Sequence, residues 1–200
     1  MAKRASSGME VLLGLLTIEP MSGYDLKQVI QNSTRHFWSE SYGQIYPNLK
    51  RMAAAGLVQA KTEKSRGKPD RRVYSITGKG RERLAEWLAR EPQPEVPRNE
   101  LLLKLFFGAQ AAPEILIGFM ERMAENERAV LQQFAAVEKE IARNRQYPDS
   151  PYWKMVLRFG QIELTAHQRW FRESLAELNK LAAKRGGAPA NRKEARHAGK

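Results

Sequence analysis

The sequence predicts a mainly helical protein that carries one small β-hairpin and folds as two domains. Three stretches with helical spacing lie within residues 9–56, and a basic hairpin pattern follows them. The proline-rich linker 91–98 then leads into a second half in which apolar residues recur every three or four positions. With 200 residues and 42% hydrophobic side chains, the chain can bury a core in each half.

Two helices open the first half. Residues 9–18 are apolar on nearly every side, as expected of a helix that is packed from several directions, and Pro20 ends this stretch. Ser22 and Asp25 then form an S-x-x-D capping box in front of Leu26. This pattern predicts a second, short helix.

A third helix is predicted by another capping box, formed by Ser41 and Gln44, and Gly56 is its expected C-terminal cap. Pro47 falls in its second turn, where the missing N–H and the bulky ring disturb the helix. We therefore expect a bend that re-aims the exposed N-terminal end. The apolar face of this helix carries Ile45, Leu49 and Met52.

Residues 57–62 and 71–76 alternate as short β-strands do, and a basic, turn-rich loop separates them. Thr77 caps a following helix, whose expected apolar face carries Leu84, Trp87 and Leu88. Three helices followed by a hairpin is the order of a winged helix-turn-helix, in which the third helix enters the major groove and the hairpin lies along the DNA backbone. Residues 9–90 are therefore expected to form a DNA-binding domain, preceded by a flexible N-terminus at 1–8.

The charge distribution supports this interpretation. The chain has a net charge of +12, and residues 45–83 alone hold 11 basic and 3 acidic side chains. Such clustering is typical of nucleic-acid binding, although a solvated charged face is the alternative. The third helix offers polar groups for bases and phosphates at Ser41, Tyr42, Gln44, Asn48, Lys50 and Arg51. The alternative is that its tyrosines belong to the core and that its polar side chains are only solvated.

Five segments together resemble the PadR family of bacterial transcription regulators: "SGYDL", "IYPNLKRMAAAGLV", "RRVYSITGKGRERL", "RNELLLKLFFG" and "HQRWFRESLAEL". The last two resemble the C-terminal helical domain of the virulence-regulator-like branch. The resemblance implies a homodimer that binds a pseudo-palindromic operator in double-stranded DNA, usually as a repressor that a small, often aromatic, effector releases. It implies base contacts from Ser41, Tyr42, Gln44, Tyr46 and Asn48. It implies backbone contacts in and beside the wing from Lys64, Arg66, Lys68, Arg71 and Arg72.

Residues 99–184 are expected to form a helical, coiled-coil-like domain for dimerisation and effector binding. Pro113 suits the start of a long helix, along which an apolar heptad stripe runs from Leu116 to Ile141 and is broken only by Glu127. Glu127 either sets the register or marks where the stripe meets solvent, and we favour the second interpretation. A last helix spans about 152–183, where Gly160 predicts close approach by another helix. Its apolar face is too wide for one neighbouring helix to cover, which predicts dimerisation.

The last helix also carries candidate effector-pocket residues, with plain core or dimer interface as the alternative: Trp153, Phe159, His167, Trp170 and Phe171. Phe106 and Phe107 lie in an apolar run and are expected in the core. The tail 185–200 has no apolar face, so we expect it to be disordered, and its basic charge either adds DNA affinity or only keeps the chain soluble.

No enzymatic function is expected. The chain has no cysteine and only three histidines, and none of these lies in a metal-binding motif, so we expect no catalytic residues, no metal and no cofactor. No segment is long enough to cross a bilayer, which predicts a cytoplasmic, nucleoid-associated protein without a membrane partner. The alternatives to a specific regulator are an architectural protein that binds DNA of any sequence and a helical adaptor protein that does not bind DNA.

Overall fold

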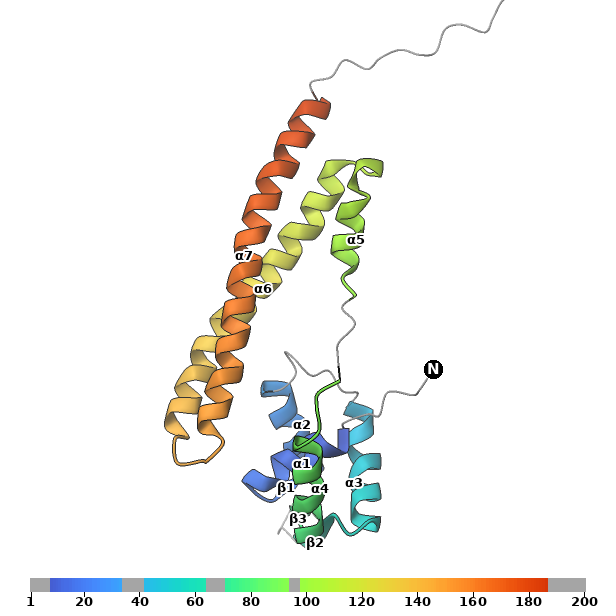
Figure 1. The fold of residues 1–200 in the computed structure, drawn as a ribbon, viewed down its shortest axis with the longest axis vertical. Coiled ribbons are helices and arrows are strands. Elements are labelled where there is room, and N and C mark those ends of the chain that lie inside the picture. The colour runs from blue at the N-terminus through green and yellow to red at the C-terminus, as the bar shows by residue number, and fades with distance from the viewer. Residues whose placement is uncertain (1–7, 34–41, 64–70, 94–97, 187–200) are drawn as a thin grey trace, which may run out of the picture. The chain divides into compact units, whose positions relative to one another are not determined.

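The structure, a computed structural model, describes residues 8–33, 42–63, 71–93 and 98–186. The chain divides into two compact units, Met1–Glu95 and Val96–Lys200, and each has its own apolar core. Figure 1 confirms the predicted fold class, because helices dominate both units and the one described sheet is small.

The N-terminal unit combines helices with a three-stranded antiparallel sheet of order β1-β3-β2. Its elements are α1 (Gly8–Ile18), β1 (Met21–Ser22), α2 (Gly23–Asn32), the 3₁₀ turn η2 (Tyr42–Gln44), α3 (Ile45–Ala54), β2 (Val58–Glu63), β3 (Arg71–Ile76) and α4 (Gly78–Leu88). The predicted hairpin is confirmed, and its register pairs Val58 with Ile76 and Glu63 with Arg71. The short strand β1 was not predicted, because two residues carry no readable alternation.

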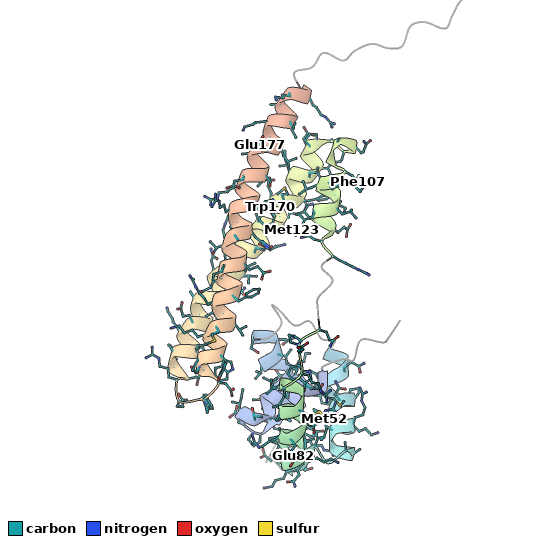
Figure 2. All side chains as sticks on the ribbon, viewed as in Figure 1. Met52, Glu82, Phe107, Met123, Trp170 and Glu177 are labelled. Atoms are coloured by element: carbon teal, nitrogen blue, oxygen red, sulfur yellow. The ribbon has the colours of Figure 1, made fainter. Side chains whose placement is uncertain are left out.

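Helix α1 forms the centre of this unit, where it contacts α3, α4 and β3. Leu12 and Leu13 are 1% and 0% exposed, which confirms the packing predicted from the apolar residues around this helix. Leu49 and Met52 of α3 are fully buried, and Figure 2 shows Met52 among the side chains of the N-terminal unit. Burial of each such side chain stabilises the fold by about 1.5–3 kcal/mol, so the core holds α3 firmly against α1.

Helix α3 begins later than its sequence pattern predicts, and this explains why Pro47 is tolerated. The α-helix starts at Ile45, after the 3₁₀ turn, so Pro47 is its third residue. The first backbone N–H groups of a helix have no partner within the helix, so the missing N–H costs nothing there. The expected bend within the helix is therefore replaced by a 3₁₀ entry. Ser41, the expected cap, lies outside the described residues.

The C-terminal end of α3 is closed as predicted. Gly56 has φ +72°, a left-handed conformation that glycine adopts without strain. The N–H of Leu57 donates to the Met52 carbonyl at 2.9 Å, and the N–H of Gly56 donates to the Ala53 carbonyl at 3.1 Å. This is a Schellman arrangement, and it sets the direction in which the chain enters β2.

Over residues 98–186, the C-terminal unit is built of helices. Its elements are α5 (Glu100–Phe106), η3 (Gly108–Gln110), α6 (Pro113–Arg143) and α7 (Ser150–Gly186). Helices α6 and α7 pack along each other as a long pair, which is visible in Figure 1. A Cβ atom at Gly160 would lie 3.1 Å from Cε2 of Phe134, so the predicted close approach is confirmed and its partner is α6 of the same chain.

Three expectations for apolar and polar side chains are corrected. Phe106 and Phe107 are 81% and 59% exposed rather than in the core, because the core-facing side of α5 is taken by Leu101. Leu88 is 67% exposed, so it does not join Leu84 in packing. Glu127 does not simply meet solvent. Both of its carboxylate oxygens lie 3.2 Å from Nδ1 of His167 on α7, which favours the register-setting interpretation.

Candidate nucleic-acid interface

The exposed face of α3 presents a compact set of polar and charged side chains. Ile45, Asn48, Leu49 and Met52 form its buried stripe. The opposite side carries Tyr46, which is 61% exposed, together with the exposed Lys50 and Arg51. Gln44 is exposed at the helix N-cap and makes no side-chain capping bond. Hydrogen-bonding groups and cations on one face of a helix are suited to a DNA groove and its flanking phosphates.

Asn48 lies on the buried side of α3, whereas its predicted contact with a base requires an exposed side chain. It is 4% exposed, and its Oδ1 accepts a hydrogen bond from Nη2 of Arg51 at 2.7 Å. Its carboxamide therefore faces the guanidinium of Arg51 instead of solvent. In this position Asn48 orients a neighbouring cation of the same helix rather than presenting an amide to a base.

The position of the Tyr46 ring depends on Gly23, the first residue of α2. A Cβ atom at Gly23 would lie 2.5 Å from Cε1 of Tyr46 and 3.0 Å from its Cζ. These distances are well inside normal carbon–carbon contact, so only glycine leaves room for the ring. The glycine of the "SGYDL" segment thus lets α2 and α3 approach at the point where Tyr46 is displayed.

The start of α4 holds the other end of α3. The Thr77 hydroxyl lies 2.8 Å and 3.0 Å from the carbonyl oxygens of Gly56 and Leu57, and it also accepts the N–H of Gly80 at 3.1 Å. Nζ of Lys79 donates to the Ala55 carbonyl at 3.0 Å. The T-G-K-G segment therefore has a structural role, because it fixes the C-terminal end of α3.

The hairpin carries exposed cations whose surroundings differ. Lys61 on β2 is exposed, and Arg72 on β3 is exposed with its guanidinium 5.5 Å from the Tyr74 ring centroid. Arg71, the first residue of β3, instead forms an ion pair with Asp25 of α2. The other predicted wing residues, Lys64, Arg66 and Lys68, lie outside the described residues.

Asp25 sits at the centre of a small polar cluster. Its Oδ2 accepts the backbone N–H of Ser22 at 2.8 Å and the Ser22 hydroxyl at 2.9 Å, which confirms the predicted capping box, and it also accepts from Arg71. Partial burial raises the pKa of this carboxyl, but the hydrogen bonds from Ser22 and the charge of Arg71 outweigh burial and lower the pKa below its usual range. Asp25 is therefore ionised near neutral pH.

The predicted effector residues lie in separate groups along α7. Phe171 is buried and lies beside His167 and Trp170, with ring centroids 6.5 Å and 5.1 Å away. Trp153 contacts the ring of Tyr147 instead. Phe171 follows Trp153 by 18 positions on one helix, a separation of about 27 Å. Phe159 is 63% exposed.

Comparisons with known proteins assign both halves of the chain. Residues 12–86 match the transcriptional regulator PadR-like family, and residues 97–179 match the virulence activator alpha C-terminal family. The chain therefore contains a domain of the PadR-like family of transcriptional regulators, followed by a C-terminal region of the virulence-activator type. Because this is a family of regulators, the prediction that the chain is not an enzyme is confirmed by its relatives.

PadR-family proteins of known sequence and structure are similar over different shares of the chain. The negative transcriptional regulator PadR of Bacillus subtilis is 35% identical over 97 residues, which are 48% of this chain and 53% of that protein. The chain spans about half the length of the curated relatives it matches.

Three solved structures share the fold over most of the chain. The structure of Bacillus subtilis PadR with operator DNA has a TM-score of 0.76 at 24% identity, covering 88% of this chain and 99% of that one. The same protein with p-coumaric acid has a TM-score of 0.67 at 24% identity, covering 86% and 98%. The Vibrio cholerae virulence activator AphA has a TM-score of 0.69 at 27% identity, covering 87% and 99%.

Some residues that shape the candidate interface were not predicted from the sequence. Lys61 could have been found by charge alone, since it lies in the predicted hairpin. Gly23 and Lys79 gave no local signal, because their roles depend on contacts with a distant helix. Within the described ranges, no group of three acidic or histidine side chains could hold a metal ion, and no helix has the length and hydropathy needed to cross a bilayer.

Proposed function

We propose that this PadR-family chain is a sequence-specific regulator that binds double-stranded DNA through α3 and the β2–β3 hairpin. The observation that carries the proposal is the exposed face of α3, where Gln44, Tyr46, Lys50 and Arg51 stand opposite a buried stripe. The helix is anchored at both ends, by the 3₁₀ entry and by the bonds from Thr77 and Lys79. A rigid, polar helix face of this kind suits readout of a major groove.

The contacts divide into two classes. Gln44 and Tyr46, with Ser41 and Tyr42 before them, are assigned to bases and nearby phosphates. Lys50, Arg51, Lys61 and Arg72 are assigned to the DNA backbone, together with the wing residues Lys64, Arg66 and Lys68. Backbone contacts supply affinity without sequence information, whereas base contacts supply specificity. Asn48 is left out of the base-reading set because it is buried against Arg51.

We further propose that the chain acts as a homodimer on a pseudo-palindromic operator. The first half of α7 keeps an apolar stripe exposed even though α6 covers another side of the helix. Its members are Tyr152, Met155, Val156, Phe159 and Ile162, which are between 45% and 66% exposed. They recur at helical spacing, and an exposed apolar patch of this kind is typical of an association surface. Two-fold symmetry would place two α3 helices about 34 Å apart.

Repression and release by an effector complete the proposal. The name of the Bacillus subtilis relative supports repression, and its structure with p-coumaric acid supports an aromatic effector for that protein. Within one chain only His167, Trp170 and Phe171 lie together, so a pocket that also uses Trp153 or Phe159 needs further walls. A cytoplasmic, nucleoid-associated location follows from this function.

The decisive experiment titrates the full chain against two labelled duplexes of equal length, by fluorescence anisotropy at about 50 and 200 mM salt. One duplex carries the DNA upstream of the chain's own gene, and the other is its scrambled counterpart. A specific regulator binds the upstream duplex about 10³-fold or more tightly at the higher salt. Equal binding, lost together as salt rises, would leave only an architectural role. Absence of binding at either salt would favour the adaptor alternative.

A further inference from the structure

We infer that Arg71 is a positioning residue, which fixes the start of β3 to α2 through Asp25, and that it is not a phosphate contact. The inference rests on the proposed DNA-binding function. It separates Arg71 from Arg72, its neighbour in sequence, although the two carry the same charge. The geometry at the end of β1 distinguishes the two residues.

Strand β1 is shorter than the strand with which it pairs. Met21 lies opposite Tyr74 and Ser22 lies opposite Val73, and the chain then turns into α2. Arg71 therefore extends two positions beyond the last β1 pair. The first turn of α2 lies next to this overhang, and Asp25 in that turn binds the Arg71 guanidinium. The ion pair thus continues the attachment of β3 after the strand ladder has ended.

The carboxylate of Asp25 is oriented by hydrogen bonds that do not involve Arg71. Oδ2 of Asp25 takes the N–H and the hydroxyl of Ser22 at 2.8 Å and 2.9 Å, and these bonds lock the carboxylate at the helix N-terminus. The Arg71 and Asp25 side chains are 51% and 31% exposed. A half-exposed ion pair adds little to global stability. Its effect is local, since it decides where the hairpin starts relative to α2 and α3.

The contributions of Arg71 and Arg72 to DNA binding can therefore be compared within the same strand. The charge of Arg71 is balanced by an adjacent carboxylate, so its approach to a phosphate would release few counterions. Arg72 lies on the other face of β3, near the Tyr74 ring, and is exposed. Each cation that neutralises a phosphate contributes about 0.9 to the slope of log affinity against log salt. Arg72 is expected to contribute to this slope, whereas Arg71 is not.

The substitution Asp25→Asn gives a test in which the two interpretations predict opposite changes in DNA affinity. Removal of a negative charge near DNA should strengthen binding if Arg71 is a phosphate contact, because the guanidinium is then released. If Arg71 is a positioning residue, Asp25→Asn should weaken binding to the upstream duplex by about three- to tenfold. Glu19→Gln is the matched control, since it removes one exposed acidic charge from the same unit.

The experiment measures full-chain variants Asp25→Asn, Arg71→Gln, Arg72→Gln and the Asp25→Asn/Arg71→Gln pair by anisotropy across a salt series, well below their melting temperatures. Positioning predicts equal losses for Asp25→Asn and Arg71→Gln, no further loss in the pair, and an unchanged salt slope. Arg72→Gln should reduce the slope by about 1. A purely structural role would lower melting temperature but leave affinity and slope unchanged, which would overturn the inference.

Other outcomes are equally informative. A lower salt slope for Arg71→Gln, with tighter binding by Asp25→Asn, would make Arg71 a phosphate contact and refute the inference. Asp25→Glu keeps a carboxylate and should recover part of the affinity lost in Asp25→Asn. Failure of the proposed function would look different, because the wild-type chain itself would then show no preference for the upstream duplex.

Discussion

Replacement of Gly23 by alanine tests whether the position of Tyr46 matters for DNA recognition. The new Cβ atom would lie 2.5 Å from Cε1 of Tyr46, whereas carbon atoms in contact are about 3.5–4.0 Å apart. The ring must therefore retreat by about 1 Å or more. Tyr46 is 61% exposed, so it can move outward without disturbing the core.

Gly23→Ala is expected to change the affinity for DNA more than the stability of the fold. Gly23 is the first residue of α2 and has a negative φ, so alanine is compatible with its backbone and changes the free energy of unfolding by less than about 1 kcal/mol. Loss of one well-placed contact with DNA costs about 1–3 kcal/mol, which is roughly 5- to 150-fold in affinity. We expect Gly23→Ala to weaken binding to the upstream duplex within this range while its thermal unfolding is nearly unchanged.

The assay is anisotropy with the upstream and scrambled duplexes, combined with thermal unfolding followed by circular dichroism. Gly14→Ala is the matched control, because Gly14 lies within α1 and a Cβ atom there meets nothing within 4 Å. A Tyr46→Ala background completes the cycle, and in it Gly23→Ala should have no further effect on affinity. Unchanged affinity of Gly23→Ala in the otherwise wild-type chain would show that the position of the Tyr46 ring does not matter for DNA binding.

Three further predictions concern stability and assembly. Because the pKa of Asp25 is lowered by folding, the stability that its ionised carboxylate contributes is fully present above the unfolded-state pKa of about 3.9 and is lost as pH falls through the lower folded-state pKa. Acid titrations of unfolding should show this loss in the wild type and not in Asp25→Asn. Gly160→Val places a larger side chain against Phe134, which lies 3.1 Å from the position of a Cβ atom at residue 160. It should lower the free energy of unfolding by about 1–3 kcal/mol and the melting temperature in calorimetry by several degrees. An unchanged melting temperature would contradict the close approach. Phe159→Glu places a charge in the exposed apolar stripe of α7 and should shift sedimentation toward the monomer, whereas the neighbouring Arg158→Glu should not; a Phe159→Glu dimer as stable as the wild type would exclude this face.

The parts of the fold that follow from local chemistry were predictable from the sequence. The capping box at Ser22 and Asp25, the left-handed Gly56, and the starts of α4 at Thr77 and α6 at Pro113 all depend on residues close together in the chain. Gly160 was also predictable, because a glycine in a long helix is costly unless a neighbour requires it. Such signals set where elements begin and end, but they do not say which side chains remain exposed.

The burial of Asn48 could have been predicted from the sequence. Ile45, Leu49 and Met52 define the apolar face of α3, and position 48 lies three residues after the first and four before the last. Helical geometry therefore places Asn48 on the buried face, whatever its side chain could bind. The prediction considered the ability of an Asn side chain to bind adenine and gave less weight to the position of residue 48 on the helix. Burial next to Arg51 follows from the spacing alone.

The charge count predicts that residues 45–83 contact DNA, but it does not show which of these cations have partners within the protein. Of the cations within residues 45–83, Arg71 is paired with Asp25 and Arg83 with the buried Glu10, and their partners lie 46 and 73 residues away in sequence. Lys79 is bonded to a backbone carbonyl at the end of α3. Each of these contacts is created by the tertiary fold, so no local pattern reveals it. A basic segment thus overstates the number of phosphate contacts, and the salt slope of DNA binding should be smaller than its 11 cations suggest.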